Sequence, residues 1–293
     1  MPPGFEVVQK NGPQRDKFPP LIWDSLLLSF AESFLAWLAA TGISAFAGLG
    51  FAFGIGKYLK PRYFLAFSLG VILWVFMDVI DNAAKLDVDA SFSGGWEQFN
   101  LVVLFVIAII VFLYLDRSVF SPGVSAGVGL AIPLLIAIGV GIHGVGEGGA
   151  FGEVSSTTPL NSLFLVFGGE ASGAAYVLHK FLESMAIGAG YLMFSREEVI
   201  RISKRMRDSV LLVLAFVMPS VVAMVAGYYI EYNIVYFYAL GSGALLFVLL
   251  KFAGPLYTTR GAEDTSGSLR TGAWIVAGFL CVYLAALLHS YVS

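Results

Sequence analysis

Two short stretches of the sequence carry the same pattern of residues that can bind metals. One begins at His143 and contains Glu147, and the other begins at His179 and contains Glu183; both read His-x-x-x-Glu-small-x-Ala-x-Gly. Residues four apart lie on one face of a helix. Imidazole and carboxylate groups together suit Zn²⁺, and also Fe²⁺, Mn²⁺ or Co²⁺, whereas Ca²⁺ and Mg²⁺ prefer oxygen ligands. The pattern therefore predicts two helices that each present a pair of metal ligands.

The composition places these helices in a membrane. Hydrophobic residues make up 58% of the 293-residue chain and charged residues only 13%, whereas soluble domains carry about 25% charged residues. Apolar stretches of about 20 residues, long enough to cross a bilayer, recur along the chain. We expect an all-α, polytopic integral membrane protein with a flexible tail at residues 1–22 and a membrane domain at 23–293. Its eight expected transmembrane helices are residues 24–55, 62–84, 97–116, 124–152, 160–194, 209–230, 232–252 and 271–291.

The distribution of basic residues predicts the orientation of the chain. Connections on one side of the expected bundle hold twelve of the 17 Lys and Arg residues, and those on the other side, with the N-terminal tail, hold four. Because cytoplasmic connections carry the excess of basic residues, both termini are expected outside the cytoplasm, in the plasma membrane. The outer connections are acidic, which concentrates cations. Lipid is the expected surrounding, and nothing indicates a nucleic-acid partner.

The depth of the two motifs supports a metal site. Ionisable groups in the middle of a membrane helix cost a few kcal/mol each, and they persist where they pair, face a cavity or bind an ion. Two carboxylates and two neutral imidazoles carry a formal charge of −2, which neutralises a divalent cation. A single histidine in an apolar helix is more often structural. Here two of the three histidines share one pattern on consecutive spans. His289 is not part of such a pattern and is expected at a membrane interface.

The two motifs resemble those of the ZIP family (Zrt- and Irt-like proteins) of divalent-metal transporters. In that family the fourth span carries His-Asn-x-x-Glu-Gly, which matches residues 143–148, and the fifth carries His-Glu-x-x-His-Glu or a relative, which aligns with residues 179–184. Pro219 and Gly227 in the sixth span also agree. The resemblance implies a ZIP-like bundle of eight spans with both termini outside, a metal site between spans four and five, alternating access and a homodimer.

The sequence departs from the family at the second metal ion of the family's two-metal centre. The residues that match the ligands of that ion are Gly144, Lys180 and Met218, which are poor or impossible ligands. We expect the Lys180 ammonium to replace the second cation, so that the site holds one divalent ion. The alternative is that Lys180 extends to the membrane interface, as long basic side chains can.

Acidic residues towards the expected outer side are candidates for a metal entry path. Two lie near the end of the second span, and the others lie near the ends of spans one, four and five: Asp78, Asp81, Glu32, Glu153 and Glu170. The alternative for Asp78, Asp81 and Glu153 is an ordinary solvated acid of a loop, and the alternative for Glu32 and Glu170 is an ion pair with Lys85.

The function predicted from the sequence is transport and not catalysis. A divalent transition metal, Zn²⁺ above all, would move from outside into the cytoplasm through His143, Glu147, His179 and Glu183. No organic cofactor is expected, and no Gly-x-x-x-x-Gly-Lys-Ser/Thr phosphate loop is present. Two alternatives stay open: an intramembrane zinc hydrolase, since zinc with an open position activates water, and a sensor whose core is held together by a metal.

Overall fold

The computed structural model describes residues 29–84, 95–120, 129–157, 170–195, 202–231, 233–258 and 265–290. Within these ranges all regular structure is helical, which confirms the expected all-α fold. The first rod consists of α2 (Phe30–Leu38), a π-helical turn η2 (Ala39–Ile43) and α3 (Ser44–Ile55). It is followed by α4 (Pro61–Ala84), α5 (Gly95–Leu115) with η4 (Asp116–Phe120), α7 (Ala131–Thr157), α9 (Glu170–Phe194), α10 (Ile202–Tyr229), α11 (Val235–Thr258) and α12 (Thr265–Ser290).

Seven of these rods are long and apolar enough to cross a membrane, which indicates an integral membrane protein. The remaining rod, α9, corresponds to the fifth expected span, residues 160–194. It has 25 residues but is not among the seven, because His179, Lys180 and Glu183 lower its hydropathy. It begins at Glu170, and the first part of the expected span 160–194 lies outside the described residues. So does the expected tail at residues 1–22.

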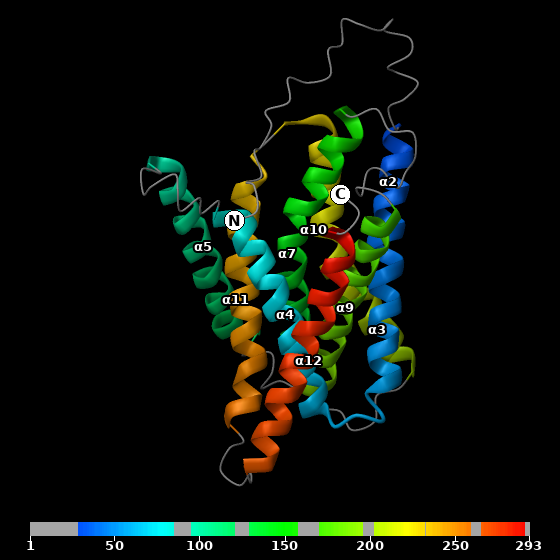
Figure 1. The fold of residues 1–293 in the computed structure, drawn as a ribbon, viewed down its shortest axis with the longest axis vertical. Coiled ribbons are helices and arrows are strands. Elements are labelled where there is room, and N and C mark those ends of the chain that lie inside the picture. The colour runs from blue at the N-terminus through cyan, green and yellow to red at the C-terminus, as the bar shows by residue number, and fades with distance from the viewer. Residues whose placement is uncertain are drawn as a thin grey trace, which may run out of the picture.

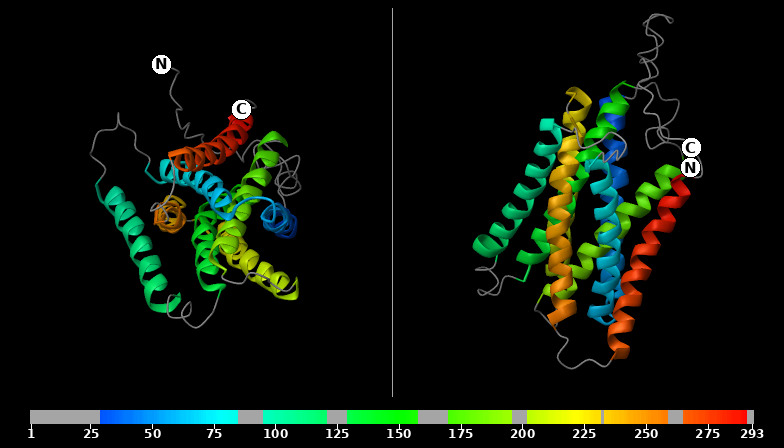
Figure 2. Two further views of the ribbon diagram at one scale, coloured as in Figure 1. Left: turned by 90° about the horizontal axis from the view of Figure 1, so that it is seen from below. Right: turned by 60° about the vertical axis from the view of Figure 1, so that its left-hand side comes forward.

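The helices alternate in direction along the chain (Figure 1), and their contacts divide them into two groups. In one group α10 packs along α7, and α3 packs along α9; in the other α4 packs against α11 and α12, and α5 packs against α11. The groups meet where α11 contacts α7 and where α4 and α12 contact α9. Helix α5 lies at the edge of the bundle (Figure 2) and exposes apolar side chains such as Val102, Ile110 and Tyr114. The candidate ligands on α7 and α9 therefore lie at the centre, where the two groups meet.

We call one end of the bundle the mouth end. It is the end at which α4, α7 and α12 finish and at which α2, α9 and α11 begin (Figure 1). Because α2 begins and α12 finishes at this same end, the described helices start and end on one side of the bundle. This agrees with an even number of crossings.

The π-helical turn in the first rod lies beside the centre of the bundle. Single π-helical turns inside α-helices are rare and are frequently found at functional sites. Here the Thr41 hydroxyl donates to the Trp37 carbonyl at 2.7 Å, and the Trp37 indole nitrogen donates to Ser220 Oγ on α10 at 3.3 Å. The turn and these bonds hold Trp37 against the inside of the bundle, where only 2% of its surface is exposed.

Candidate metal centre

The structure brings the two histidine–glutamate pairs together. Helix α7 supplies His143 and Glu147, α9 supplies His179 and Glu183, and one ligand atom from each lies within 4.8 Å of all the others. Glu183 Oε1 is the most central atom, at 2.8 Å from His143 Nε2 and 2.5 Å from His179 Nε2. Glu147 Oε1 closes the group at 3.8 Å and 3.9 Å from the same nitrogens. Two antiparallel helices thus direct four metal-type ligands at one point.

These separations fit a metal ion. Zinc bonds to nitrogen and oxygen of about 2.0–2.1 Å place the ligand atoms of a tetrahedral site about 3.3 Å apart. The observed distances of 2.5–3.9 Å lie on both sides of that value. His179 Nε2 and Glu183 Oε1 are buried and, within the described residues, make no hydrogen bond of good geometry. Buried polar atoms normally have a hydrogen-bond partner. A metal ion bound between these two atoms would therefore remove the energetic cost of burying them without one.

A backbone contact sets which nitrogen of His143 can bind. Its Nδ1 contacts the Val140 carbonyl oxygen, three residues earlier on α7. A carbonyl only accepts hydrogen bonds, so Nδ1 carries the proton and Nε2 is left with a lone pair that faces the cluster. Metal-bound histidines are commonly oriented by such a bond from their second nitrogen.

The Lys180 ammonium lies inside the same cluster. Its Nζ is 2.6 Å from Glu147 Oε2, 2.9 Å from Glu183 Oε2 and 3.2 Å from His143 Nε2, and only 2% of the residue is exposed. Lys180 therefore does not extend to an interface. The two oxygens of each carboxylate have different neighbours: Oε1 faces the imidazoles and Oε2 faces the ammonium. With neutral histidines the formal charge of the five groups is −1.

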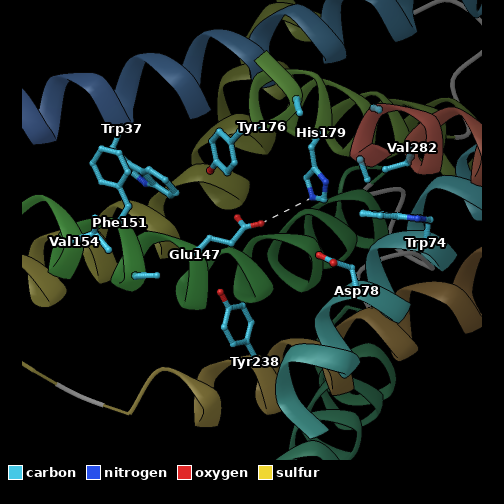
Figure 3. Close-up of a pocket in the computed structure, with 14 residues that line it drawn as sticks. Trp37, Trp74, Asp78, Glu147, Phe151, Val154, Tyr176, His179, Tyr238 and Val282 are labelled. Carbon is cyan, nitrogen blue, oxygen red and sulfur yellow. Dashed lines mark ion pairs between the residues drawn. The ribbon is translucent and has the colours of Figure 1, made fainter. Parts of the chain in front are cut away.

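The four ligands differ in their access to solvent. His143 and Glu183 have no exposed side-chain surface, whereas His179 and Glu147 keep 15% and 21%. The two accessible ligands line a cavity of about 500 Å³ (Figure 3). On α7 the lining continues from Glu147 to Val154, and on α9 it runs back from His179 to Ala175. Both directions lead to the mouth end, so the cluster lies at the floor of a cavity that extends to one end of the bundle.

The opposite direction is filled by apolar side chains. One turn beyond the ligands, Val140 on α7 and Ile187 on α9 are at most 1% exposed, as are Leu212 on α10 and Val248 on α11. These residues belong to the main hydrophobic core. A hydrated ion could not cross this layer without a rearrangement, because buried polar groups need partners that the layer does not supply.

The three residues that match the family's second-metal ligands lie in different surroundings. Lys180 lies in the cluster. Gly144 is buried beside it, and a Cβ added there would lie 3.7 Å from Glu147 Oε2. Met218 is 46% exposed and lines a separate apolar groove with Leu214 and Val222. The α10 side chain that lies closest to Gly144 is Ser220.

The acidic residues predicted to form an entry path also lie in different surroundings. Asp78 on α4 lines the cavity and points towards the same space as Glu147 (Figure 3). Asp81 and Glu153 are not among the residues that line it. Glu32 is exposed and forms a capping box with Ser29 at the start of α2, where its Oε2 accepts from the Ser29 backbone nitrogen at 2.9 Å. The side chain of Glu170 lies outside the described part of the chain.

Sequence reasoning missed the aromatic side chains that form much of the cavity wall. Trp37, Trp74, Phe151, Tyr176 and Tyr238 all line it. Helical spacing could have found three of them. Trp74 is four residues before Asp78, Tyr176 is three before His179, and Phe151 is four after Glu147, so each shares a face with a residue that was singled out.

Gly241 on α11 controls how closely that helix approaches His143. A Cβ added at Gly241 would lie 2.6 Å from His143 Cα and 2.9 Å from its Cβ, closer than packed atoms allow. We expect Gly241→Ala to push α11 and α7 apart and to weaken Zn²⁺ binding roughly tenfold, as for loss of a group that orients a ligand. Isothermal titration calorimetry on the purified protein measures this. Gly254→Ala on the same helix is the control, since an added Cβ there meets nothing within 4 Å. Equal affinities in the two variants would contradict the prediction.

The chain matches no protein-family model, and no curated protein gives a significant match. The fold and the site by themselves define a helical membrane protein with a candidate metal-binding cluster at the centre of its bundle.

Proposed function

We propose that the protein transports a divalent transition-metal ion across the membrane, with Zn²⁺ the best fit to two imidazoles and two carboxylates and with Fe²⁺, Mn²⁺ or Co²⁺ as further substrates. The observation that carries the proposal is the place of the cluster. Four ligands from α7 and α9 converge at the floor of a cavity that extends to one end of the bundle, and a buried apolar layer closes the other side. A structural site would need no such approach from one end.

The graded exposure of the ligands suggests an order of binding. An ion that enters from the mouth end first meets Glu147 and His179, and then exchanges its remaining water for His143 and Glu183. The positive-inside rule assigns the mouth end to the extracytoplasmic side, so uptake would run from outside into the cytoplasm. Release requires that the apolar layer around Val140 and Ile187 opens while the cavity closes. Binding must be tight enough to select the ion and weak enough to release it.

The presence of Lys180 supports a single ion per site. Its ammonium occupies the side of both carboxylates that the imidazoles leave free. A second divalent ion there would lie within a few ångströms of a fixed positive charge, and at 4 Å two unit charges repel by about 4 kcal/mol at an effective dielectric constant of about 20. The convergence of the α7 and α9 motifs supports assigning the chain to the ZIP family, and Lys180 would make it a member with one metal ion at the centre.

Uptake of Zn²⁺ into proteoliposomes tests the proposed function. Wild-type protein should admit Zn²⁺ faster than empty liposomes, and His143→Ala should abolish the difference, because it removes a fully buried member of the four-ligand cluster. His289→Ala, a histidine in the last turn of α12, serves as the matched control and should retain uptake. If Zn²⁺ binds in detergent but never crosses the membrane, the protein is a metal-stabilised sensor and not a transporter. Uptake that survives His143→Ala would remove the proposed site.

A further inference from the structure

The cavity above the cluster has more aromatic surface than a metal ion requires. Its volume of about 500 Å³ lies within the range of small-molecule pockets, roughly 300–1,000 Å³. Transition-metal ions bind oxygen, nitrogen and sulfur atoms, and aromatic carbon is not among their ligands. Five aromatic rings line the cavity, from α2, α4, α7, α9 and α11. The lining therefore points to a ligand with an organic body.

The aromatic wall is a packed and rigid surface. The Trp37 ring lies between Phe151 and Tyr176, with centroid distances of 4.8 Å and 5.2 Å. Trp74 meets His179 in an edge-to-face arrangement at 5.9 Å. Rings held by one another keep their orientation, so little conformational entropy is lost when a ligand binds to them.

The charge of the cavity selects a cation. Asp78 and Glu147 are both in its lining, which contains no Lys or Arg among the described residues. Lys180, just below the floor, is already paired with Glu147 and Glu183. With neutral histidines, the carboxylates of Asp78, Glu147 and Glu183 and the ammonium of Lys180 carry a formal charge of −2. An anionic ligand would be repelled, and a neutral one would lack the charge–charge attraction that Asp78 and Glu147 offer to a cation.

Aromatic faces with nearby carboxylates are the recurring environment for ammonium ions, because a ring face attracts a cation without forming a bond to it. The chain already uses the cavity wall in this way: Lys180 Nζ lies 5.6 Å from the centroid of the Tyr176 ring. We propose that the cavity binds a small organic ammonium ion, with its charged group between Asp78 and the rings of Trp74 and Tyr238.

Such a ligand would regulate the metal site. Glu147 and His179 form the floor of the cavity, so an ammonium ion above them covers the two ligands that an entering metal meets first. The ammonium ion and the metal should therefore compete. This consequence rests on the proposed function, whereas binding of the ammonium ion itself does not.

Calorimetric titration of the wild-type protein in a detergent without choline groups tests the binding. The probes are choline and its uncharged analogue 3,3-dimethylbutan-1-ol, which has the same shape without the positive charge. Choline should bind saturably and about tenfold or more tightly than the alcohol, the difference that a desolvated cation–π contact and a carboxylate provide. Asp78→Asn and Trp74→Leu should each weaken choline binding severalfold.

Trp274→Leu is the matched control. Trp274 stacks on Tyr63 at a centroid distance of 6.5 Å and is not among the cavity residues, so choline binding should be unchanged in this variant. Equal affinity for choline and the alcohol, or choline binding that is unaffected by Asp78→Asn and Trp74→Leu, would overturn the proposal. Zn²⁺ titration of the same sample distinguishes a failure of the proposed ammonium site from a failure of the proposed transport function. Choline binding without Zn²⁺ binding would refute the transport function and leave this site in place, and the reverse result would refute this site alone.

Discussion

Replacement of Glu183 by glutamine should weaken Zn²⁺ binding by about a hundredfold or more. Loss of a group that only orients a ligand costs about 10- to 100-fold, and Glu183 is itself the shared ligand: its Oε1 lies 2.8 Å and 2.5 Å from the two imidazole nitrogens. An amide removes one of the two negative charges that balance the ion. It would also leave the buried Lys180 ammonium with Glu147 as its one remaining carboxylate in the cluster.

The matched control is Glu153→Gln, on α7 and outside both the cluster and the cavity lining. Calorimetry should show wild-type Zn²⁺ affinity for Glu153→Gln and little or no binding for Glu183→Gln. Thermal unfolding without metal separates loss of the site from loss of the fold, because a folded Glu183→Gln protein should still melt cooperatively. Folded Glu183→Gln protein with wild-type affinity would show that the metal lies elsewhere.

The convergence of the two motifs could be predicted from the sequence, because it depends only on residue spacing and on the packing of two consecutive helices. Spacing of four places His143 with Glu147 and His179 with Glu183 on single helix faces, and consecutive membrane helices are neighbours with opposite directions. The high cost of ionisable groups in lipid then favours an inward orientation for both faces. The proximity of Lys180 to Glu183 follows from their spacing of three in the same way.

The surroundings of the site were harder to predict from the sequence, because they depend on helices that lie far apart along the chain. Trp37 on α2, Trp74 on α4 and Tyr238 on α11 meet at one cavity, and no local pattern relates them. Met218 shows the same limit. Its place before Pro219 matches a ligand position by alignment, but the rotation of α10 turns it towards an exposed apolar groove. Glu32 was a candidate for the entry path, yet its spacing of three from Ser29 is the signature of a capping box.

Replacement of Lys180 by aspartate should raise the number of divalent ions bound from one to two. The ammonium contacts Oε2 of both Glu147 and Glu183, and the imidazoles face Oε1 of the same residues. Removing the ammonium leaves two carboxylate oxygens directed at one vacant position. The aspartate side chain is shorter than lysine, but a metal–oxygen bond of about 2.0–2.2 Å makes up part of the difference. Mass spectrometry under native conditions, or metal analysis after desalting, counts the bound ions.

Lys180→Met separates the charge of the lysine from the added ligand of the aspartate. It removes the repulsion without supplying an oxygen, so one ion should still bind, with an affinity at least about tenfold higher; the repulsion of about 4 kcal/mol between unit charges at 4 Å sets the scale. Lys251→Met is the control for loss of a lysine from an ion pair within the helices, since Lys251 pairs with Asp116 at 2.6 Å, outside the cluster. It should leave both stoichiometry and affinity unchanged. Two ions in the wild-type protein, or weaker binding in Lys180→Met, would mean that the ammonium supports metal binding and does not replace a cation.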